Sequence, residues 1–292
     1  MQSKSFGLSC ALALPLKDFF SIDFDRLAAH ARRCVAAGCS SVTVFGTTGE
    51  GASVSLAERE QVLETLSDGG LEMSRQVLGG IAAASVGDAV EQARMVIQRG
   101  CRGLLVAPPF YYKGVADDGL YGWFSRFFER IEPQGSEVIL YHIPSVTEVA
   151  VSIRLIQRLR EAFPEIVKGV KDSGNEWSYT EELLRMQSDL LVLIGNERHL
   201  SAGVRLGAQG AISGLANLYP EILLKVMATG SEDARVAALA GEILRFPLTS
   251  AVKSLLANRY NDPAWSAVRP PLVTLSKAEA AALASACDRI VS

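Results

Sequence analysis

Lys171 is the side chain in this sequence whose surroundings most clearly indicate covalent chemistry. It comes directly after the apolar run of residues 165–170, in the stretch EIVKGVKDSG. A short run of this kind is typical of a strand buried on both faces. An amine at the end of such a strand is desolvated, which favours its neutral form and lets it attack a carbonyl carbon. A nearby tyrosine, for which Tyr111, Tyr112 and Tyr141 at the ends of apolar runs are candidates, could then move the protons that imine formation requires.

The turn GTTGEG, residues 46–51, supplies a second group of polar atoms. Its backbone N–H groups and the hydroxyls of Thr47 and Thr48 suit a small carboxylate. We assign Glu50, in the same turn, to supporting the turn rather than to reacting. Amine, phenol and turn together predict a site for a small molecule that carries a carbonyl and a carboxylate.

Other chemistries have weak support in the sequence. Metal-dependent hydrolysis has little support, because His30, His142 and His199 show no spacing typical of metal ligands. A serine triad would need a nucleophile elbow, and neither that motif, a P-loop nor a dinucleotide-binding fingerprint is present. We therefore predict an enzyme with no metal and no cofactor.

A repeated pattern of elements must position these residues. Short apolar runs recur, each followed by an amphipathic segment, which indicates βα units and a parallel sheet. About eight such units within ~230 residues predict an α/β fold, a (β/α)8 TIM barrel, in which function lies where strands end. A doubly wound open sheet is the alternative, but the first run lacks its glycine-rich turn. The runs lie at 7–14, 40–46, 76–82, 102–109, 137–144, 165–170, 190–195 and 210–214.

The pattern changes after residue 229. Helical segments such as DARVAALAGEILRF and SKAEAAALASACDRIV follow one another without intervening strands. We predict a catalytic barrel over residues 1–229 and a C-terminal helical extension over residues 230–292, packed on the barrel.

Composition limits the partners and the compartment. The 292 residues are 49% hydrophobic and 21% charged, with a formal net charge of −3 and no basic runs, which argues against nucleic acid as a partner. The five cysteines form no C-x-x-C pair, which suits a reducing cytoplasm. The apolar run near the N-terminus is too short to span a membrane and lacks a clear cleavage site, so we expect the first strand there.

Four motifs, in this order along the chain, resemble those of the pyruvate-dependent class I aldolases, the dihydrodipicolinate synthase and N-acetylneuraminate lyase superfamily. The motifs are GTTGE at 46–50, YHIPSVT at 141–147, GVKDS at 169–173 and GAQGAISGLAN at 207–217. The resemblance covers about the whole chain, including the trailing helices. It is specific for the superfamily and much less so for the substrate.

The resemblance implies a role for each matching residue. Lys171 would form the Schiff base with the keto carbon of pyruvate, and Tyr141 would shuttle protons. Thr47 would link Tyr141 to Tyr112, which in the family typically comes from the neighbouring subunit. The family thus implies a homo-oligomer, a dimer or a tetramer built as a dimer of dimers. Substrate contacts are expected at Thr48, through the backbone at Ile212, and at Gly195, Glu197, Ser173, His142 and Arg198.

Departures from the family pattern indicate which branch the chain belongs to. Diaminopimelate-pathway synthases carry an arginine in the fifth-strand motif, where this chain has Val146. Since that arginine binds the aldehyde substrate's carboxylate, its loss argues against dihydrodipicolinate synthesis. The KDS sequence at Lys171 resembles the sugar-acid members. Arg198 could bind a distal carboxylate, sulfonate or phosphate.

We therefore predict a cytoplasmic lyase that makes or breaks a C–C bond between pyruvate and an aldehyde, on a 2-keto-3-deoxy sugar acid. Three alternatives stay open. They are a 2-keto-3-deoxy sugar-acid dehydratase that uses the same imine, a dihydrodipicolinate synthase, and a non-catalytic barrel that binds a keto acid and regulates.

Overall fold

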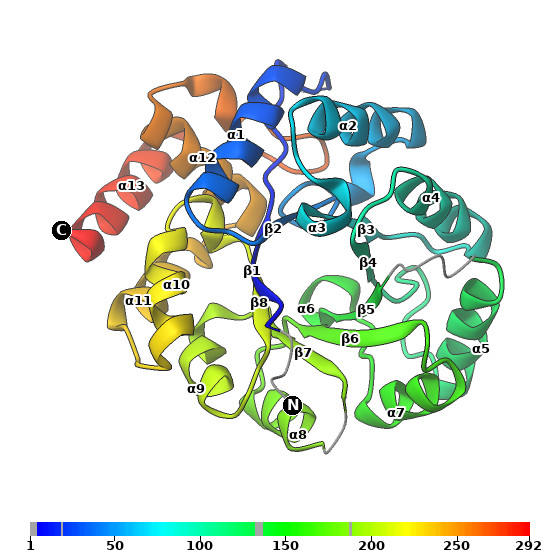
Figure 1. Ribbon diagram of the computed structural model, residues 1–292. Coiled ribbons are helices and arrows are strands. Elements are labelled where there is room, and N and C mark those ends of the chain that lie inside the picture. The colour runs from blue at the N-terminus through cyan, green and yellow to red at the C-terminus, as the bar shows by residue number, and fades with distance from the viewer. Residues whose placement is uncertain (1–4, 19, 132–136, 187–188) are drawn as a thin grey trace.

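The strands form a closed parallel barrel in which each strand pairs with the next along the chain and the last pairs with the first. The computed structural model describes residues 5–18, 20–131, 137–186 and 189–292. Figure 1 shows the helices as a ring around this barrel. The predicted (β/α)8 TIM barrel is confirmed. The strands are β1 Gly7–Ala11, β2 Ser41–Val44, β3 Val77–Ile81, β4 Gly103–Val106, β5 Glu137–His142, β6 Val167–Asp172, β7 Leu191–Ile194 and β8 Gly210–Ser213.

The strands are apolar along most of their length because the barrel buries both of their faces. Ile139, Leu193 and Ile212 belong to a compact cluster inside the barrel, together with Tyr141. Val138 and Leu140 alternate with Ile139 and Tyr141 and pack in the larger cluster between the barrel and its helices. The interior cluster lies inside the barrel, beneath the polar residues at the C-terminal ends of the strands.

Several helices of the barrel begin or end at residues that the sequence indicates. Ser55 and Glu58 form the predicted capping box. Gly38, Gly100 and Gly207 follow helices with positive φ angles of 100°, 68° and 94°, a region that glycine enters at little cost. These helices are α1 Phe24–Ala36, α2 Leu56–Asp68, α3 Met73–Gln76, α4 Val86–Gln98, α5 Asp117–Phe128, α6 Pro144–Thr147, α7 Ile153–Ala162, α8 Trp177–Arg185, α9 Leu200–Arg205 and α10 Pro220–Thr229.

The C-terminal segment is helical, as predicted. It contains α11 Ala234–Ile243, α12 Leu248–Tyr260 and α13 Lys277–Val291. Figure 1 shows these helices on the side of the barrel formed by α1 and α10. The described ranges also contain four short 3-10 helices, η1 Gly51–Ser53, η2 Glu197–His199, η3 Leu215–Asn217 and η4 Pro263–Ser266. A division into a barrel domain and an extension at residues 229 and 230 stays a prediction.

Strand β6 is longer at its C-terminal end than the apolar run predicts. We expected Lys171 at the point where the strand meets its loop, whereas Lys171 and Asp172 both lie within the strand. Lys171 pairs with Tyr141 and Asp172 with His142 across the β5–β6 ladder. Because side chains alternate along a strand, Lys171 and Lys168 point to opposite sides, and Lys168 lies against Glu165 at the outside.

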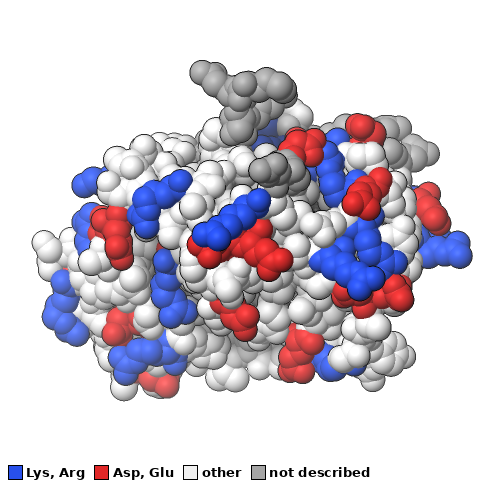
Figure 2. Space-filling view, turned by 90° about the horizontal axis from the view of Figure 1, so that it is seen from below, with Lys and Arg blue, Asp and Glu red and all other residues white. Residues whose placement is uncertain are grey.

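The described helices and one face of the surface (Figure 2) bear on the sequence-based expectations about membrane spans and charge. Among the helices of the described ranges, none has the length and apolar character needed to cross a membrane. On the face seen in Figure 2, Lys and Arg side chains lie next to Asp and Glu side chains rather than in a field of one sign. The five cysteines are buried and free.

Candidate active site

A cavity of about 690 Å³ opens at the C-terminal ends of the strands. This is the end of a TIM barrel where active sites occur. Most of the predicted site residues line it. They are Thr47, Thr48, Tyr141, Lys171, Ser173, Gly195, Glu197, Arg198 and Ile212. The volume is several times that of a three-carbon keto acid, so the cavity has room for a larger substrate.

Lys171 and Tyr141 form the central pair of the cavity. The lysine Nζ donates to the tyrosine hydroxyl oxygen over 3.1 Å. Only 5% of Lys171 and 6% of Tyr141 is exposed. The pair exists because β5 and β6 are neighbours in register and both side chains point into the barrel. An amine and a phenol at this distance can exchange a proton directly, which imine formation and breakdown require.

The segment after Lys171 is held by hydrogen bonds that start behind the strand. The Asp172 carboxylate accepts from the Thr180 hydroxyl over 2.6 Å and from the Gly174 amide over 2.7 Å. On the cavity side, Gly195 leaves the space that Lys171 needs. A Cβ at Gly195 would come within 2.9 Å of the Lys171 Cε and 2.1 Å of the Ser173 Oγ. Any larger residue at position 195 would therefore displace the lysine or the serine.

The turn at residues 46–51 presents Thr47 and Thr48 to the cavity. Phe45 and Glu50, at its two ends, both have positive φ angles, 61° and 52°. Residues other than glycine rarely adopt this region without support from their surroundings. Here the Gly51 amide donates to the Gly46 carbonyl over 3.0 Å, and Thr249 of α12 donates its hydroxyl to the Thr47 carbonyl over 3.1 Å.

The structure places His142 outside the cavity. Its ring stacks on Tyr179 with 4.0 Å between the ring centroids, and its Nδ1 accepts from the Val151 amide over 3.2 Å. Burial lowers the pKa of His142, and the nearby Asp172 carboxylate opposes that shift. Because His142 follows the inward-pointing Tyr141 in β5, its side chain points outward. The expected contact between His142 and the substrate is therefore not supported by its position.

Tyr112 also lies away from the cavity of its own chain. It is 74% exposed, and its ring contacts Tyr111 edge-on with 5.2 Å between the centroids. An exposed aromatic pair next to the barrel mouth fits a residue that serves a neighbouring subunit. The predicted role of Tyr112 in the partner's site stays a prediction.

Glu197 and Arg198, which follow each other at the end of β7, differ in their contacts. The Glu197 carboxylate accepts from the Ser213 hydroxyl over 2.6 Å and from the Leu215 amide over 3.3 Å. Glu197 thus joins the ends of β7 and β8. Arg198 is exposed at the cavity, and within the described part of the chain its guanidinium makes no ion pair. Arg198 is available for an anionic ligand.

The sequence did not predict the outer wall of the cavity. Part of this wall comes from the C-terminal extension, through Leu244, Arg245, Leu248, Thr249 and Leu272. Asn175 and Asn196 complete the rim near β6 and β7. Asn196 lies in the strand end GNERH and could have been named from it. The extension residues carry no signal of this kind, because their helices are not in the βα pattern that marks the site.

No metal site competes with the lysine in the described ranges, where three or more His, Cys, Asp or Glu side chains do not come together as ligands. The inner end of the cavity offers a buried amine, a phenol and the hydroxyls of the turn, and its rim adds amide, carboxylate and guanidinium groups.

Comparisons with known proteins agree with this geometry. The model of the dihydrodipicolinate synthetase family matches residues 4–289. A DapA-like lyase of Chloroflexus aurantiacus is 31% identical over 98% of this chain and 97% of its own. The crystal structure of a dihydrodipicolinate synthase from Agrobacterium tumefaciens has 45% identity and a TM-score of 0.94, over 98% of this chain and 100% of that one.

A more distant structure shares the fold. It is that of a prophage protein of E. coli K12, of the dihydrodipicolinic acid synthase family, in complex with pyruvate. It has 20% identity and a TM-score of 0.88, over 98% of each chain.

Proposed function

Since the chain belongs to the dihydrodipicolinate synthetase family and is a lyase of that family, we propose that it is a pyruvate-dependent class I aldolase acting on a 2-keto-3-deoxy sugar acid. The observation that carries the proposal is the buried pair of Lys171 Nζ and Tyr141 hydroxyl, 3.1 Å apart, beside the turn of Thr47 and Thr48. Lysine imine chemistry needs no metal and no further cofactor.

The proposed reaction begins at the keto carbon. The neutral Lys171 amine attacks it, and loss of water from the carbinolamine gives the imine, with Tyr141 passing protons. Thr47, Thr48 and the amides of their turn hold the adjacent carboxylate. In the cleavage direction the C4 hydroxyl loses its proton to Tyr141 as the C3–C4 bond breaks. The bonding electrons pass into the protonated imine, so that an enamine and an aldehyde form. The proton taken up by Tyr141 then returns to C3 of the enamine, and water adds to the restored imine and releases pyruvate and the Lys171 amine.

The substrate preference rests on the rim. Val146, which lines the cavity and is 57% exposed, stands where the diaminopimelate-pathway synthases place an arginine. An apolar side chain there offers no charge to the carboxylate of an amino-acid semialdehyde. Ser173, Asn175 and Asn196 instead offer hydrogen-bonding groups to sugar hydroxyls.

The outer end of the cavity favours a substrate with a second anion. Arg198 and Arg245 both line the cavity and are both exposed. Arg245 pairs with Glu242 over 2.9 Å, whereas Arg198 makes no ion pair with a described residue. Guanidinium groups bind carboxylates and phosphates well because two parallel N–H groups match two oxygens. We place a distal carboxylate or phosphate of the substrate between these two arginines.

A second candidate is dihydrodipicolinate synthesis. The name of the Agrobacterium tumefaciens protein, at 45% identity, favours it. The same lysine imine would then react with aspartate semialdehyde, and a residue other than Val146 would have to hold its carboxylate.

The test is a substrate panel with purified protein. Pyruvate release from 2-keto-3-deoxy sugar acids would support the aldolase. A product that keeps the whole carbon chain would identify the dehydratase instead. Condensation of pyruvate with aspartate semialdehyde at a higher kcat/KM would overturn the sugar-acid assignment. Binding of pyruvate without turnover of any aldehyde would favour the remaining alternative, a non-catalytic barrel that binds a keto acid and regulates.

We further propose that the protein is a homo-oligomer, a dimer or a tetramer built as a dimer of dimers, with Tyr112 contributed across the subunit contact. The exposed pair of Tyr111 and Tyr112 supports this arrangement. Dilution of the protein below the dissociation constant of the assembly would lower activity, and Tyr112→Phe would lower activity without changing the number of subunits. A cytoplasmic location remains part of the proposal.

A further inference from the structure

We propose that the buried ion pair of Glu50 and Lys253, with Thr249 and Arg269, positions the Thr47–Thr48 turn and so sets its affinity for the substrate carboxylate. These four residues are called the turn brace below. The inference rests on the proposed function, because it takes this turn as the carboxylate site. It assigns a function to the C-terminal extension, which supplies Thr249, Lys253 and Arg269.

The centre of the turn brace is a charge pair with no contact to solvent. The Lys253 Nζ lies 2.6 Å from a Glu50 carboxylate oxygen, and both side chains are 0% exposed. The other Glu50 oxygen accepts from the Arg269 amide over 2.7 Å. Burial lowers the pKa of Lys253, and the Glu50 carboxylate opposes that shift. Each charge is costly to bury alone, so each holds the other in place.

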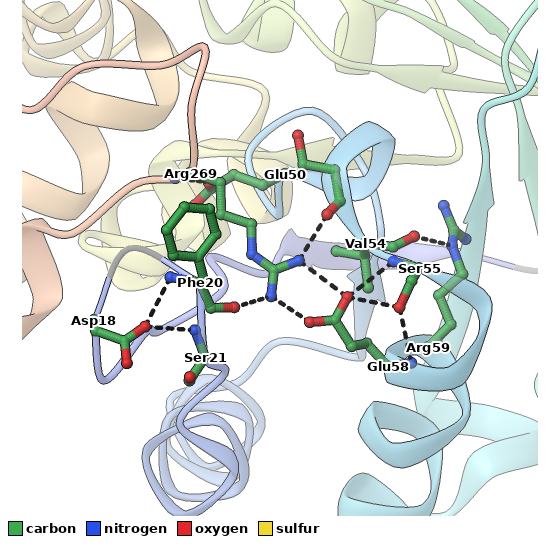
Figure 3. A network of polar contacts seen from close by, with 10 residues as sticks. Asp18, Phe20, Ser21, Glu50, Val54, Ser55, Glu58, Arg59 and Arg269 are labelled. Carbon is green, nitrogen blue, oxygen red and sulfur yellow. Dashed lines mark hydrogen bonds and ion pairs between the residues drawn. The ribbon is translucent and has the colours of Figure 1, made fainter.

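Arg269 joins the turn to two neighbouring segments, as Figure 3 shows. Its guanidinium donates to the Ser53 carbonyl over 2.6 Å and to the Glu58 carboxylate over 2.5 Å and 3.1 Å. It also donates to the Phe20 carbonyl. One side chain thus connects the loop before α1, the short helix η1 that follows the turn and the first residues of α2.

The two ends of the turn need this support because of their backbone conformation. Glu50 has a positive φ and lies only two residues after Thr48. Its amide and the Thr249 hydroxyl both donate to the Thr47 carbonyl, each over 3.1 Å. Arg59 contacts both sides of the turn: its Cζ lies 4.5 Å from the ring centroid of Phe45, just before the turn, and its guanidinium donates to the Gly51 carbonyl over 2.8 Å. The Thr47 carbonyl and the residues that flank the two threonines are therefore held in part by groups outside the turn.

Loss of Lys253 would leave the Glu50 carboxylate buried without its cation. An unpaired buried carboxylate is drawn toward water, which would move the turn that contains it. Tyr141 and Lys171 belong to β5 and β6, on another part of the barrel, and would keep their geometry. We therefore expect that loss of the turn brace weakens binding of the substrate carboxylate, whereas Lys171 still forms the imine.

The experiment compares two ketones that differ only in the carboxylate, pyruvate and methyl pyruvate. The protein is incubated with each ketone over a range of concentrations, borohydride reduces the imine, and intact-mass spectrometry gives the modified fraction. The ratio of the half-saturating concentrations measures the preference for the carboxylate. Lys253→Met should lower this preference by about tenfold or more, the loss expected for a misplaced donor to a charged group. Half-saturation by methyl pyruvate should stay within about twofold of wild type.

Two further variants keep the test valid if Lys253→Met does not fold. The double variant Glu50→Gln/Lys253→Met removes both charges, and Thr249→Val removes one hydroxyl with little change of shape. Each should lower the preference for pyruvate. Arg160→Met is the matched control, because Arg160 donates to the Val167 carbonyl over 2.6 Å at the start of β6, far from the turn. It should reduce thermal stability and leave the preference unchanged.

A preference for pyruvate that stays at the wild-type value in the folded brace variants would overturn the inference. Equal losses with both ketones would also overturn it, since they would show general damage to the site. No trapping of either ketone by the wild-type protein would instead refute the proposed function, so the two failures are distinguishable.

Discussion

The inner and outer ends of the cavity are built in opposite ways. At the inner end Lys171, Tyr141 and Thr48 are each 6% exposed or less. They sit on strands or on a turn fixed by buried charges. At the outer end Arg198 and Arg245 are exposed, and Leu244 is 48% exposed. Arg198 lies in the short 3-10 helix η2, and Leu244 and Arg245 lie in the connection between α11 and α12.

This difference separates the reaction from the choice of substrate. A buried amine and phenol on neighbouring strands are held at one geometry, which suits a chemical step shared by a family. Exposed side chains on connections can change without disturbing the barrel, which suits the recognition of different substrates. The residues of the inner end therefore indicate the chemistry of the family, whereas the residues of the outer end determine which substrate is bound.

The largest effect is expected at the inner end from Lys171→Met. Without the amine no imine can form, so kcat/KM should fall by at least ~10³-fold. The measurement is pyruvate release from the best substrate of the panel, with the fold checked by circular dichroism. A variant that keeps more than a tenth of the wild-type activity would contradict the assignment of Lys171.

Tyr141→Phe tests the proton transfer and should have the next largest effect. Loss of the hydroxyl that accepts from Lys171 should lower kcat by ~10²-fold, the usual contribution of a general acid or base. KM should change little, because the ring still fills the site. A rise in KM with kcat unchanged would show that Tyr141 binds substrate without moving protons.

Arg198→Ala and Arg245→Ala test the outer end and should have smaller, substrate-dependent effects. Each should lower kcat/KM by about tenfold or less for a 2-keto-3-deoxy acid with a distal carboxylate, since exposed pairs are screened by solvent. A substrate with a neutral distal end should be unaffected. Arg126→Ala, on α5 and away from the cavity, is the control. Unchanged kinetics with an acidic substrate would remove Arg198 from the site.

The smallest effect is expected in the pH dependence of the protein's free energy of unfolding, through the ion pair of Glu58 and Arg269. The hydrogen bond from Arg269 is the main cause that lowers the pKa of Glu58 from 4.5 to about 2. The folded protein therefore favours the carboxylate, and the stabilisation is present above the unfolded-state pKa and lost as pH falls from about 4.5 to about 2.

Urea unfolding of the wild type and of Glu58→Gln across this pH range measures the contribution. The wild type should be more stable by about 1 kcal/mol near pH 6, a value reduced for solvent screening. The difference should shrink toward zero at low pH. A difference that does not change with pH would show that the pair does not couple to protonation.

The inner end could be predicted from the sequence because its signals are local. Apolar runs located the strands, and Lys171, Tyr141 and the GTTGEG turn stand at strand ends that a barrel brings together. The orientation of His142 was also available from the sequence. If Tyr141 points into the barrel, the next residue in the strand points out. The expected substrate contact at His142 overlooked this alternation.

The outer wall and the turn brace could not be predicted in this way. Lys253 lies in a helix where a charged residue is usually solvated, and nothing nearby in the sequence indicates that Glu50, 203 positions earlier, is its partner. Arg245 belongs to a connection between α11 and α12, outside the βα pattern. Such contacts depend on how the extension packs on the barrel, which hydrophobic periodicity does not specify.

The central claim is that Lys171 forms an imine with a 2-keto acid at the inner end of the cavity. Borohydride reduction in the presence of pyruvate, followed by peptide mass spectrometry, tests it most directly. The account predicts one reduced pyruvate per chain, on the peptide that contains Lys171, and none in Lys171→Met. An adduct on another lysine, or no adduct at saturating pyruvate, would contradict it.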